Sequence, residues 1–98
     1  MGTSSKRSET NLIQYQLKFT IGAKKSLAAL PRKIQDRING VVQTLGINPL
    51  PPVAKKLSGR DAYRIRVSDY RIVYTIQKEV LTILVIAIGH RREIYRKD

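Results

Sequence analysis

The sequence predicts an α+β fold in which an antiparallel β-sheet carries two helices on one face. Residues alternate between apolar and charged from Tyr63 to Tyr74, with one polar break, which is typical of two half-buried strands. Apolar residues recur at helical spacing between positions 23 and 45, which indicates two helices. The nearly continuous apolar run 80–88 predicts a central strand covered on both faces. The predicted order of elements is therefore β-α-α-β-β-β.

Length and composition limit the possibilities further. The chain has 98 residues, of which 42% are hydrophobic, so it is expected to form one small domain. Residues 1–11 are rich in Ser, Thr and Lys and lack apolar periodicity, so we expect a disordered leader followed by a folded domain over 12–98. There is no cysteine, secretion signal or membrane-spanning run in the sequence. We expect a soluble cytoplasmic protein with no membrane association.

The first half of the chain predicts one strand and both helices. The strand spans 15–19, and Thr20 caps a helix that buries Ala23, Leu27 and Leu30. Pro31 suits the first turn of the second helix. The apolar stripe of that helix consists of Ile34, Ile38, Val41, Val42 and Leu45. Gly46 is the expected end of the second helix, and the proline-rich segment 48–52 is a rigid connector.

The second half predicts a hairpin and a last strand. Residues 54–59 form a short basic approach segment, and the hairpin follows over 63–74. A turn at 77–79 leads to the strand 80–88, which Gly89 is expected to end. If Ser68 and Asp69 form a two-residue loop, the strand pairing is fixed. The opposed pairs are then Val67 with Tyr70, Arg66 with Arg71, and Arg64 with Val73.

This pairing places three arginines on one face of the sheet. Directly opposed residues share a face, so Arg64, Arg66 and Arg71 would project together from an exposed, basic face opposite the helices. Charged side chains are common on solvent-facing strands, so exposure to solvent alone could account for these three arginines. However, like charges opposite one another destabilise a sheet, and the planar guanidinium fork suits phosphate oxygens. The arrangement therefore favours an anion-binding role.

Net charge points to the same class of partner. The chain carries 19 Lys and Arg against 7 Asp and Glu, a net charge of +12, with a pI near 10.5. Such a field attracts polyanions, so nucleic acid or an acidic protein is the expected partner. Cations concentrate in two stretches. These are Lys55, Lys56, Arg60, Arg64, Arg66 and Arg71, and then Arg91, Arg92, Arg96 and Lys97 near the C-terminus.

The C-terminal segment 89–95 is a second candidate. It directly follows the predicted buried strand, where Arg91 and Tyr95 could join the basic face and Tyr95 could stack on an RNA base. A solvated chain end accounts for the same residues equally well.

Several kinds of site are excluded. The chain has one histidine and no cysteine, its acids are scattered singly, and it has no glycine-rich phosphate loop or serine nucleophile motif. A metal-independent enzyme without a cofactor, or a binding module, remains.

Three segments together resemble a known family. Residues 56–59, 63–74 and 88–95 resemble the RelE branch of the RelE/ParE toxin superfamily, and the likeness extends from Gln14 to Tyr95. The resemblance implies a RelE-like fold and the toxin of a type II toxin–antitoxin pair. It also implies an endoribonuclease that enters the ribosomal A site and cuts mRNA, with the 2′-OH of the RNA as nucleophile and no metal. The implied partners are a cognate antitoxin, the ribosome and mRNA.

The resemblance also implies roles for individual residues. Arg64 and Arg66 stand where the family has two basic residues, and Arg71 where an arginine holds the scissile phosphate. Arg91 corresponds to the residue that assists the leaving group, and Tyr95 to a tyrosine that stacks on or orients the substrate. The remaining cations are expected to contact RNA or the ribosome, namely Lys55, Lys56, Arg60, Arg92, Arg96 and Lys97.

One departure bears on the mechanism. Some relatives have lysine where this chain has Arg64 and Arg66, and arginine is a poor general base. These arginines would then act electrostatically, and His90 is the candidate proton acceptor because its unperturbed pKa lies nearest neutrality. Two alternatives stay open: a ParE-like DNA gyrase poison, and a basic RNA-binding module without catalysis. If the chain is a toxin of either branch, its antitoxin should present acidic and apolar segments that wrap it.

Overall fold

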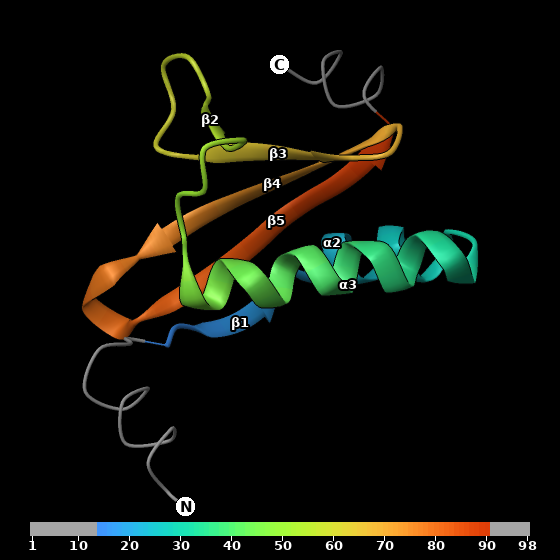
Figure 1. Ribbon diagram of the computed structural model, residues 1–98, viewed down its shortest axis with the longest axis horizontal. Helices are drawn as coiled ribbons and strands as arrows, with labels where there is room; N and C mark the ends of the chain where they lie inside the picture. Colours follow the sequence, from blue (N-terminus) through green and yellow to red (C-terminus); the bar gives the residue numbers. More distant parts are fainter. Residues whose placement is uncertain (1–13, 91–98) are drawn as a thin grey trace, which may run out of the picture.

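The computed structural model describes residues 14–90 and forms a five-stranded sheet in the order β1-β5-β4-β3-β2, with both helices on one face (Figure 1). The α+β class and the order of the predicted elements are confirmed, and one short strand, β2, is additional. The elements are β1 (Gln16–Phe19), α2 (Ile21–Ala28), α3 (Arg32–Ile47), β2 (Lys55–Lys56), β3 (Tyr63–Val67), β4 (Tyr70–Gln77), the 3-10 turn η1 (Lys78–Val80) and β5 (Thr82–His90). The predicted leader, 1–11, lies outside the described residues.

One strand pairing makes the sheet mixed. Strands β2 to β5 pair antiparallel as expected, but β1 lies parallel to β5, with Leu17 beside Ile83. The helical segment between β1 and β2 crosses over the sheet, so the first and last strands become neighbours (Figure 1). An alternating pattern identifies a strand but does not reveal its partner, which is why this pairing was not predicted.

The core lies between the helices and the sheet. Its buried residues come from both helices and three strands: Ala23, Ile38, Val42, Leu45, Ile65, Val67, Ile72, Tyr74, Ile83, Val85 and Ile88. The predicted stripe of α3 therefore faces the sheet, although Ile34 and Val41 remain half-buried. Burial of apolar side chains of this size contributes roughly 1.5–3 kcal/mol each, so this layer holds the strands in register.

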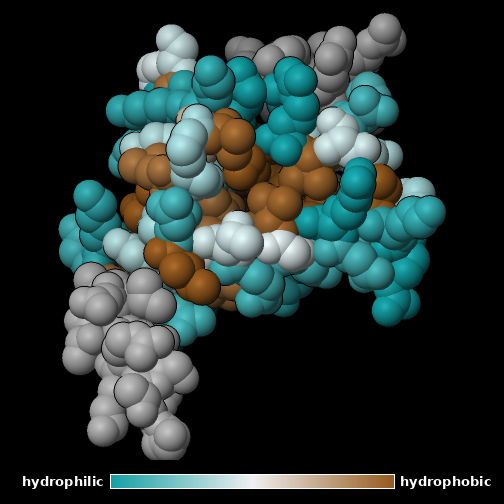
Figure 2. Space-filling model, in the orientation of Figure 1, coloured by the Kyte–Doolittle hydropathy of each residue, from teal (hydrophilic) through white to brown (hydrophobic). Residues whose placement is uncertain are grey.

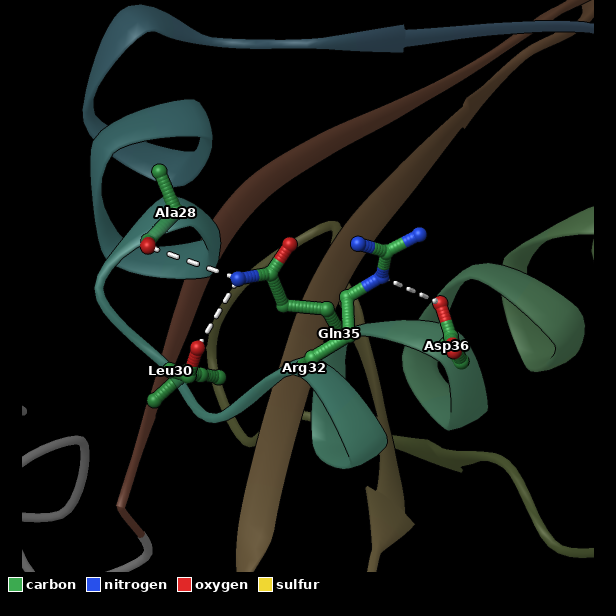
Figure 3. Close-up of polar contacts among 5 residues, drawn as sticks. All are labelled: Ala28, Leu30, Arg32, Gln35 and Asp36. Atoms are coloured by element: carbon green, nitrogen blue, oxygen red, sulfur yellow. Dashed lines mark hydrogen bonds and ion pairs between the residues drawn. The ribbon is translucent and has the colours of Figure 1, made fainter.

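The two helices meet at a polar junction. The amide of Gln35 donates to the backbone oxygen of Leu30 at 2.8 Å and to that of Ala28 at 3.4 Å (Figure 3). Pro31 is the N-cap of α3 and lies just before the first turn, one position earlier than expected. The ion pair of Arg32 with Asp36, at 3.3 Å, is exposed and contributes little to stability (Figure 3).

Gly46 does not end the second helix. It lies within α3, which continues to Ile47, and its backbone oxygen accepts a hydrogen bond from the Tyr15 N–H at 2.8 Å. A Cβ on Gly46 would meet the Tyr15 oxygen at 3.1 Å. This glycine therefore allows the close approach of α3 to the start of β1, where we expected a helix stop.

A β-bulge changes which residues of β5 face the helices. Val73 is opposite Ala87, but Tyr74 is opposite Val85, so Ile86 is the extra residue. The bulge directs Ile88 into the core and places the small residues Ala87 and Gly89 on the other face of the sheet. Strand β5 also continues through Gly89, which was expected to end it.

Thr20 joins the bulge to the first helix. Its side-chain oxygen accepts a hydrogen bond from the Ala23 N–H at 3.1 Å, which confirms the predicted cap of α2. The same hydroxyl donates to the backbone oxygen of Ile86 at 3.2 Å. One hydroxyl thus forms hydrogen bonds with a backbone N–H at the start of α2 and with the backbone oxygen of the bulged residue.

The connector after α3 is held at two points. The buried Tyr74 hydroxyl donates to the Pro49 backbone oxygen at 2.7 Å. Further along, the Ala54 N–H donates to the Pro51 oxygen at 2.9 Å and closes a turn with Pro52 and Val53 at its centre. The predicted rigid connector is therefore present, and it carries Val53 to the edge of the sheet beside β2.

Candidate functional site

The hairpin has the predicted register. Arg66 lies opposite Arg71, Arg64 lies opposite Val73, and Val67 lies opposite Tyr70. Ser68 occupies the first loop position with φ 57°, a left-handed conformation that is uncommon for serine. The two-residue loop thus fixes the strands so that Arg66 and Arg71 project from the same face of the sheet.

We call this face the arginine face and define it by Lys55, Arg64, Arg66 and Arg71. It is opposite the helices, because the intervening residues Ile65 and Ile72 belong to the core. Strand β2 extends it outward, since Lys55 pairs with Arg64. A hollow of about 560 Å³ lies at its outer edge and is lined by Pro52, Val53, Lys55, Arg64 and Arg66.

The arginine face is not exposed throughout, which corrects one expectation. Arg66 and Lys55 are exposed and Arg64 is half-buried, but Arg71 is only 2% exposed. A small apolar cluster of Ala62, Val73, Leu57, Ile86 and Ala87 also lies on this side. Strand β4 is internal, with β3 on one side and β5 on the other, so its side chains are more enclosed than those nearer the sheet edge.

His90 lies on the other face of the sheet. It is opposite Tyr70, and the two rings meet edge to face with centroids 5.8 Å apart. Its neighbour Gly89 lies opposite Arg71. The fold therefore does not bring the His90 imidazole to the face that carries Arg66 and Arg71.

The other predicted contact residues are distributed as follows. Lys56 is exposed and pairs with Tyr63, which packs against the core, so Lys56 is on the helix side. Arg60 is exposed in the loop between β2 and β3. The predicted residues of the C-terminal segment lie outside the described residues: Arg91, Arg92, Tyr95, Arg96 and Lys97.

The site offers positive charge and hydrogen-bond donors. Guanidinium and ammonium groups bind phosphate oxygens strongly and stabilise negative charge that develops on them.

Across residues 14–90, no three His, Asp or Glu side chains gather as a metal ion would require. Over the same range, no helix is long and apolar enough to span a bilayer.

Two residues of the hollow were not predicted as site residues. Pro52 was assigned only to the rigid connector 48–52 and Val53 to no element, and the structure places both beside Lys55 and Arg64. Residues 51–54 carried a turn signal, since proline is favoured at the second position of a β-turn. What the sequence did not contain was the direction in which this turn crosses the sheet edge.

Sequence comparisons find similarity to known toxins. The family model for the ParE toxin of the type II toxin–antitoxin system parDE matches residues 17–95. A RelE-like toxin protein of Escherichia coli is 36% identical over 81 residues, covering 81% of this chain and 85% of that protein. Toxin RelG of Mycobacterium tuberculosis is 31% identical over 90 residues, covering 85% of this chain and 98% of that protein.

A solved structure has the same fold. The toxin–antitoxin complex RelBE2 from Mycobacterium tuberculosis contains a chain that superimposes with a TM-score of 0.72 at 28% identity. The match covers 81% of the present chain and 100% of that chain. The likeness in fold thus covers most of the present chain.

Proposed function

Because this chain belongs to the RelE/ParE family of type II toxin–antitoxin toxins, we propose that it is a ribosome-dependent endoribonuclease that cuts mRNA in the A site. The observation that carries the proposal is the pairing of Arg66 with Arg71, which concentrates donors for phosphate on one face. Both relatives above carry RelE-type names, which favours this branch of the family. The site of action would be the cytoplasm, where ribosomes translate.

The chemistry needs no metal in this scheme. The 2′-oxygen of the RNA attacks the adjacent phosphorus, the bond from phosphorus to the 5′-oxygen breaks, and a 2′,3′-cyclic phosphate and a 5′-hydroxyl result. Arg64, Arg66 and Arg71 would stabilise the additional negative charge of the pentacoordinate phosphorane, which in a preorganised site is often the largest catalytic contribution. The leaving 5′-oxygen gains a proton, and Arg91 is the proposed group that assists it.

The proton of the 2′-hydroxyl requires an acceptor, and the described part of the arginine face does not supply one. Its three arginines stay protonated in proteins, and its one lysine, Lys55, lies on the edge strand, two strands away from Arg71. His90 is on the opposite side of the sheet beside Tyr70, so direct transfer to its imidazole would require rearrangement of the strand end. We therefore assign charge stabilisation to this face and give His90 no step.

Substrate access follows from burial. Arg66 is exposed and Arg64 half-buried, so a phosphate would meet these two side chains first. Arg71 is 2% exposed and would reach the phosphate only after it or its neighbours move. A conformational step before cleavage is therefore part of the proposal.

A cognate antitoxin is the proposed protein partner. The similar structure named above is a toxin–antitoxin complex, and the present chain carries a net charge of +12. Figure 2 shows apolar side chains gathered between α3 and β3 and framed by hydrophilic residues. Acidic segments with apolar residues would match both features.

A gyrase poison is the second candidate, because the matching family model is described as a ParE toxin. A translation extract separates the two candidates. Primer extension on the mRNA should reveal cuts in phase with codons that require ribosomes. Inhibition of supercoiling with intact mRNA would support the gyrase poison. If neither effect were observed, a binding module without catalysis would remain.

Replacement of Arg71 tests the assignment within the site. We expect Arg71→Ala to lower the rate of mRNA cleavage about a hundredfold, as for loss of one group that stabilises transition-state charge. Because Arg71 is buried, truncation would also leave a cavity, so unfolding curves must confirm that the variant folds. Arg71→Lys keeps the charge and much of the volume, and should recover part of the rate. A folded Arg71→Ala protein with full activity would refute the role.

A further inference from the structure

The hollow beside the arginine pair combines two kinds of surface. Lys55, Arg64 and Arg66 line one part, and Pro52 and Val53 line the other. Its volume is about 560 Å³, and it is open to solvent, which suits part of a longer ligand better than an enclosed small molecule. An apolar wall lies directly beside three cations, and this pairing suggests a ligand with an anionic and an apolar part.

The cations form a continuous path across the sheet. Arg71 is opposite Arg66 on β3, and Arg64 lies two residues before Arg66 on the same face. Lys55 then lies opposite Arg64 on β2, which is the edge strand. A polyanion bound at Arg66 and Arg71 would therefore leave the molecule across Arg64 and Lys55.

The apolar wall is rigid and remains in contact with solvent. Val53 is 65% exposed, yet it sits in a turn closed by the hydrogen bond from Ala54 to Pro51, with Pro52 restricting the backbone. The connector is anchored again where Tyr74 donates to Pro49. A single exposed valine needs no explanation by itself. This one is held in place at the edge of a cationic hollow, so little conformational entropy would be lost when it binds a ligand.

We propose that this hollow is a subsite for the nucleotide next to the scissile phosphate. Its phosphate contacts Lys55, and its base packs on Pro52 and Val53. Unstacked bases of single-stranded RNA present flat apolar faces that such a wall can cover. The inference rests on the proposed function, and it adds a binding element that acts on substrate affinity and leaves the chemical step unchanged.

A kinetic comparison tests the subsite. We expect Val53→Ser and Lys55→Gln each to raise the half-saturating mRNA concentration about fivefold in a translation extract, with the rate at saturation unchanged. Matched controls on η1 are Val80→Ser, where the valine is 62% exposed, and Lys78→Gln. The controls should stay within about twofold of the unaltered protein. Equal effects in test and control variants, or a loss in the saturated rate alone, would overturn the subsite.

A direct measurement of RNA binding distinguishes failure of the subsite from failure of the proposed function. A short single-stranded RNA with one 2′-deoxy nucleotide at the cut position lacks the nucleophile and stays intact. Titration into the full chain should shift the NMR signals of the Val53 methyl groups, and Lys55→Gln should reduce that shift. Shifts confined to Arg66 and its neighbours would overturn the subsite and leave the proposed nuclease standing. Response of the Val53 methyls to an acidic peptide alone would assign the hollow to a protein and also overturn it. Absence of codon-phased cuts by the unaltered protein would instead defeat the proposed function.

Discussion

Arg66 and Arg71 lie in a pairing that the sheet would not favour for stability alone. They are directly opposite each other, and Lys55 repeats the arrangement with Arg64 on the next strand. Like charges in such positions destabilise a sheet by a few tenths of a kcal/mol to about 1 kcal/mol each. Such pairs are expected where an anion neutralises them, so the stability of this sheet and the proposed binding of an anion oppose each other.

Arg66→Gln should therefore raise the stability of the protein and lower its proposed activity. We expect the free energy of unfolding to rise by roughly 0.5 kcal/mol at low salt, because one repulsion is removed, while mRNA cleavage falls. The gain should shrink in 0.5 M NaCl, where charges are screened over a few ångströms. Urea unfolding at both salt concentrations gives the measurement, with Lys24→Gln on α2 as a control of equal charge change. A loss of stability in Arg66→Gln, or equal gains in both variants, would contradict the argument.

The ionisation of Tyr74 affects the stability of the protein at alkaline pH. This tyrosine is fully buried within the core, and burial, with a smaller contribution from nearby Tyr63, raises its pKa to about 12. Its hydroxyl donates to Pro49, so it also anchors the connector that carries Val53. In the unfolded chain a tyrosine ionises near pH 10, so the folded state keeps its proton over a pH range in which the unfolded chain has lost it.

This difference predicts a loss of stability at alkaline pH. Between pH 10 and 12 the unfolded chain binds fewer protons, so the free energy of unfolding falls by about 2 kcal/mol, and below pH 10 this residue contributes no slope. Tyr74→Phe should cost about 1 kcal/mol at pH 9, from the lost hydrogen bond to Pro49, but should lack the alkaline slope. Urea unfolding of both proteins at pH 9 and pH 11 provides the comparison. Parallel pH profiles for the two proteins would show that Tyr74 is not responsible.

At the scale of elements, the bulge in β5 decides which residues flank the arginines. Without the extra residue Ile86, the alternation along β5 would direct Ile88 toward the arginine face and Gly89 toward the core. With it, Arg71 has a neighbour without a side chain. The hydrogen bond from Thr20 to the Ile86 oxygen holds this irregularity and ties it to the start of α2.

Thr20→Val should test that coupling, because valine has nearly the same shape without the hydroxyl. Loss of the helix cap and of the bond to Ile86 should lower the free energy of unfolding by about 1–2 kcal/mol. Thr20→Ser keeps both hydrogen bonds and should lie within about 0.5 kcal/mol of the unaltered protein. Chemical denaturation of the three proteins decides the matter. A valine variant as stable as the unaltered protein, or a serine variant that alone loses stability, would show that methyl packing and not the hydroxyl matters at this position.

The hairpin and the bulge show what the sequence could and could not predict. The register of Arg66 with Arg71 followed from a period of two residues and a two-residue loop, both of which are local. The bulge depends on how Tyr74 and Val85 fit into a core shared with the helices, so it is set by tertiary packing. Local pattern therefore located the arginines, whereas their neighbours on β5 required the structure.

At the scale of the whole molecule, strand order explains the remaining differences. The parallel pairing of β1 with β5 joins segments far apart in the chain, and β2 adds an edge strand beside β3. Strand β4 is internal because β3 and β5 pair with it on its two sides, and Arg71 at its start is buried although its sequence neighbours suggested exposure. The pairing of β2 with β3 brings the turn that carries Val53 beside Arg64 and forms the hollow. Charge and periodicity predict an anionic ligand, which stays a prediction, and the topology determines which of the cations such a ligand could contact.

The net charge of +12 leads to a last prediction, which separates local contact from general attraction. For single-stranded nucleic acid, the logarithm of the association constant falls with the logarithm of salt concentration by about 0.7 for each phosphate neutralised. If RNA is held by the four members of the arginine face, the slope for a short strand should be near 3, far below the value that the whole charge would give. Lys55→Gln and Lys78→Gln reduce net charge equally, so they form a matched pair. We expect Lys55→Gln to lower the slope by about 0.7 and Lys78→Gln to leave it unchanged. Fluorescence anisotropy of a labelled oligonucleotide across a salt series measures both, and equal slopes for the two variants would mean that overall charge, not this face, holds the RNA.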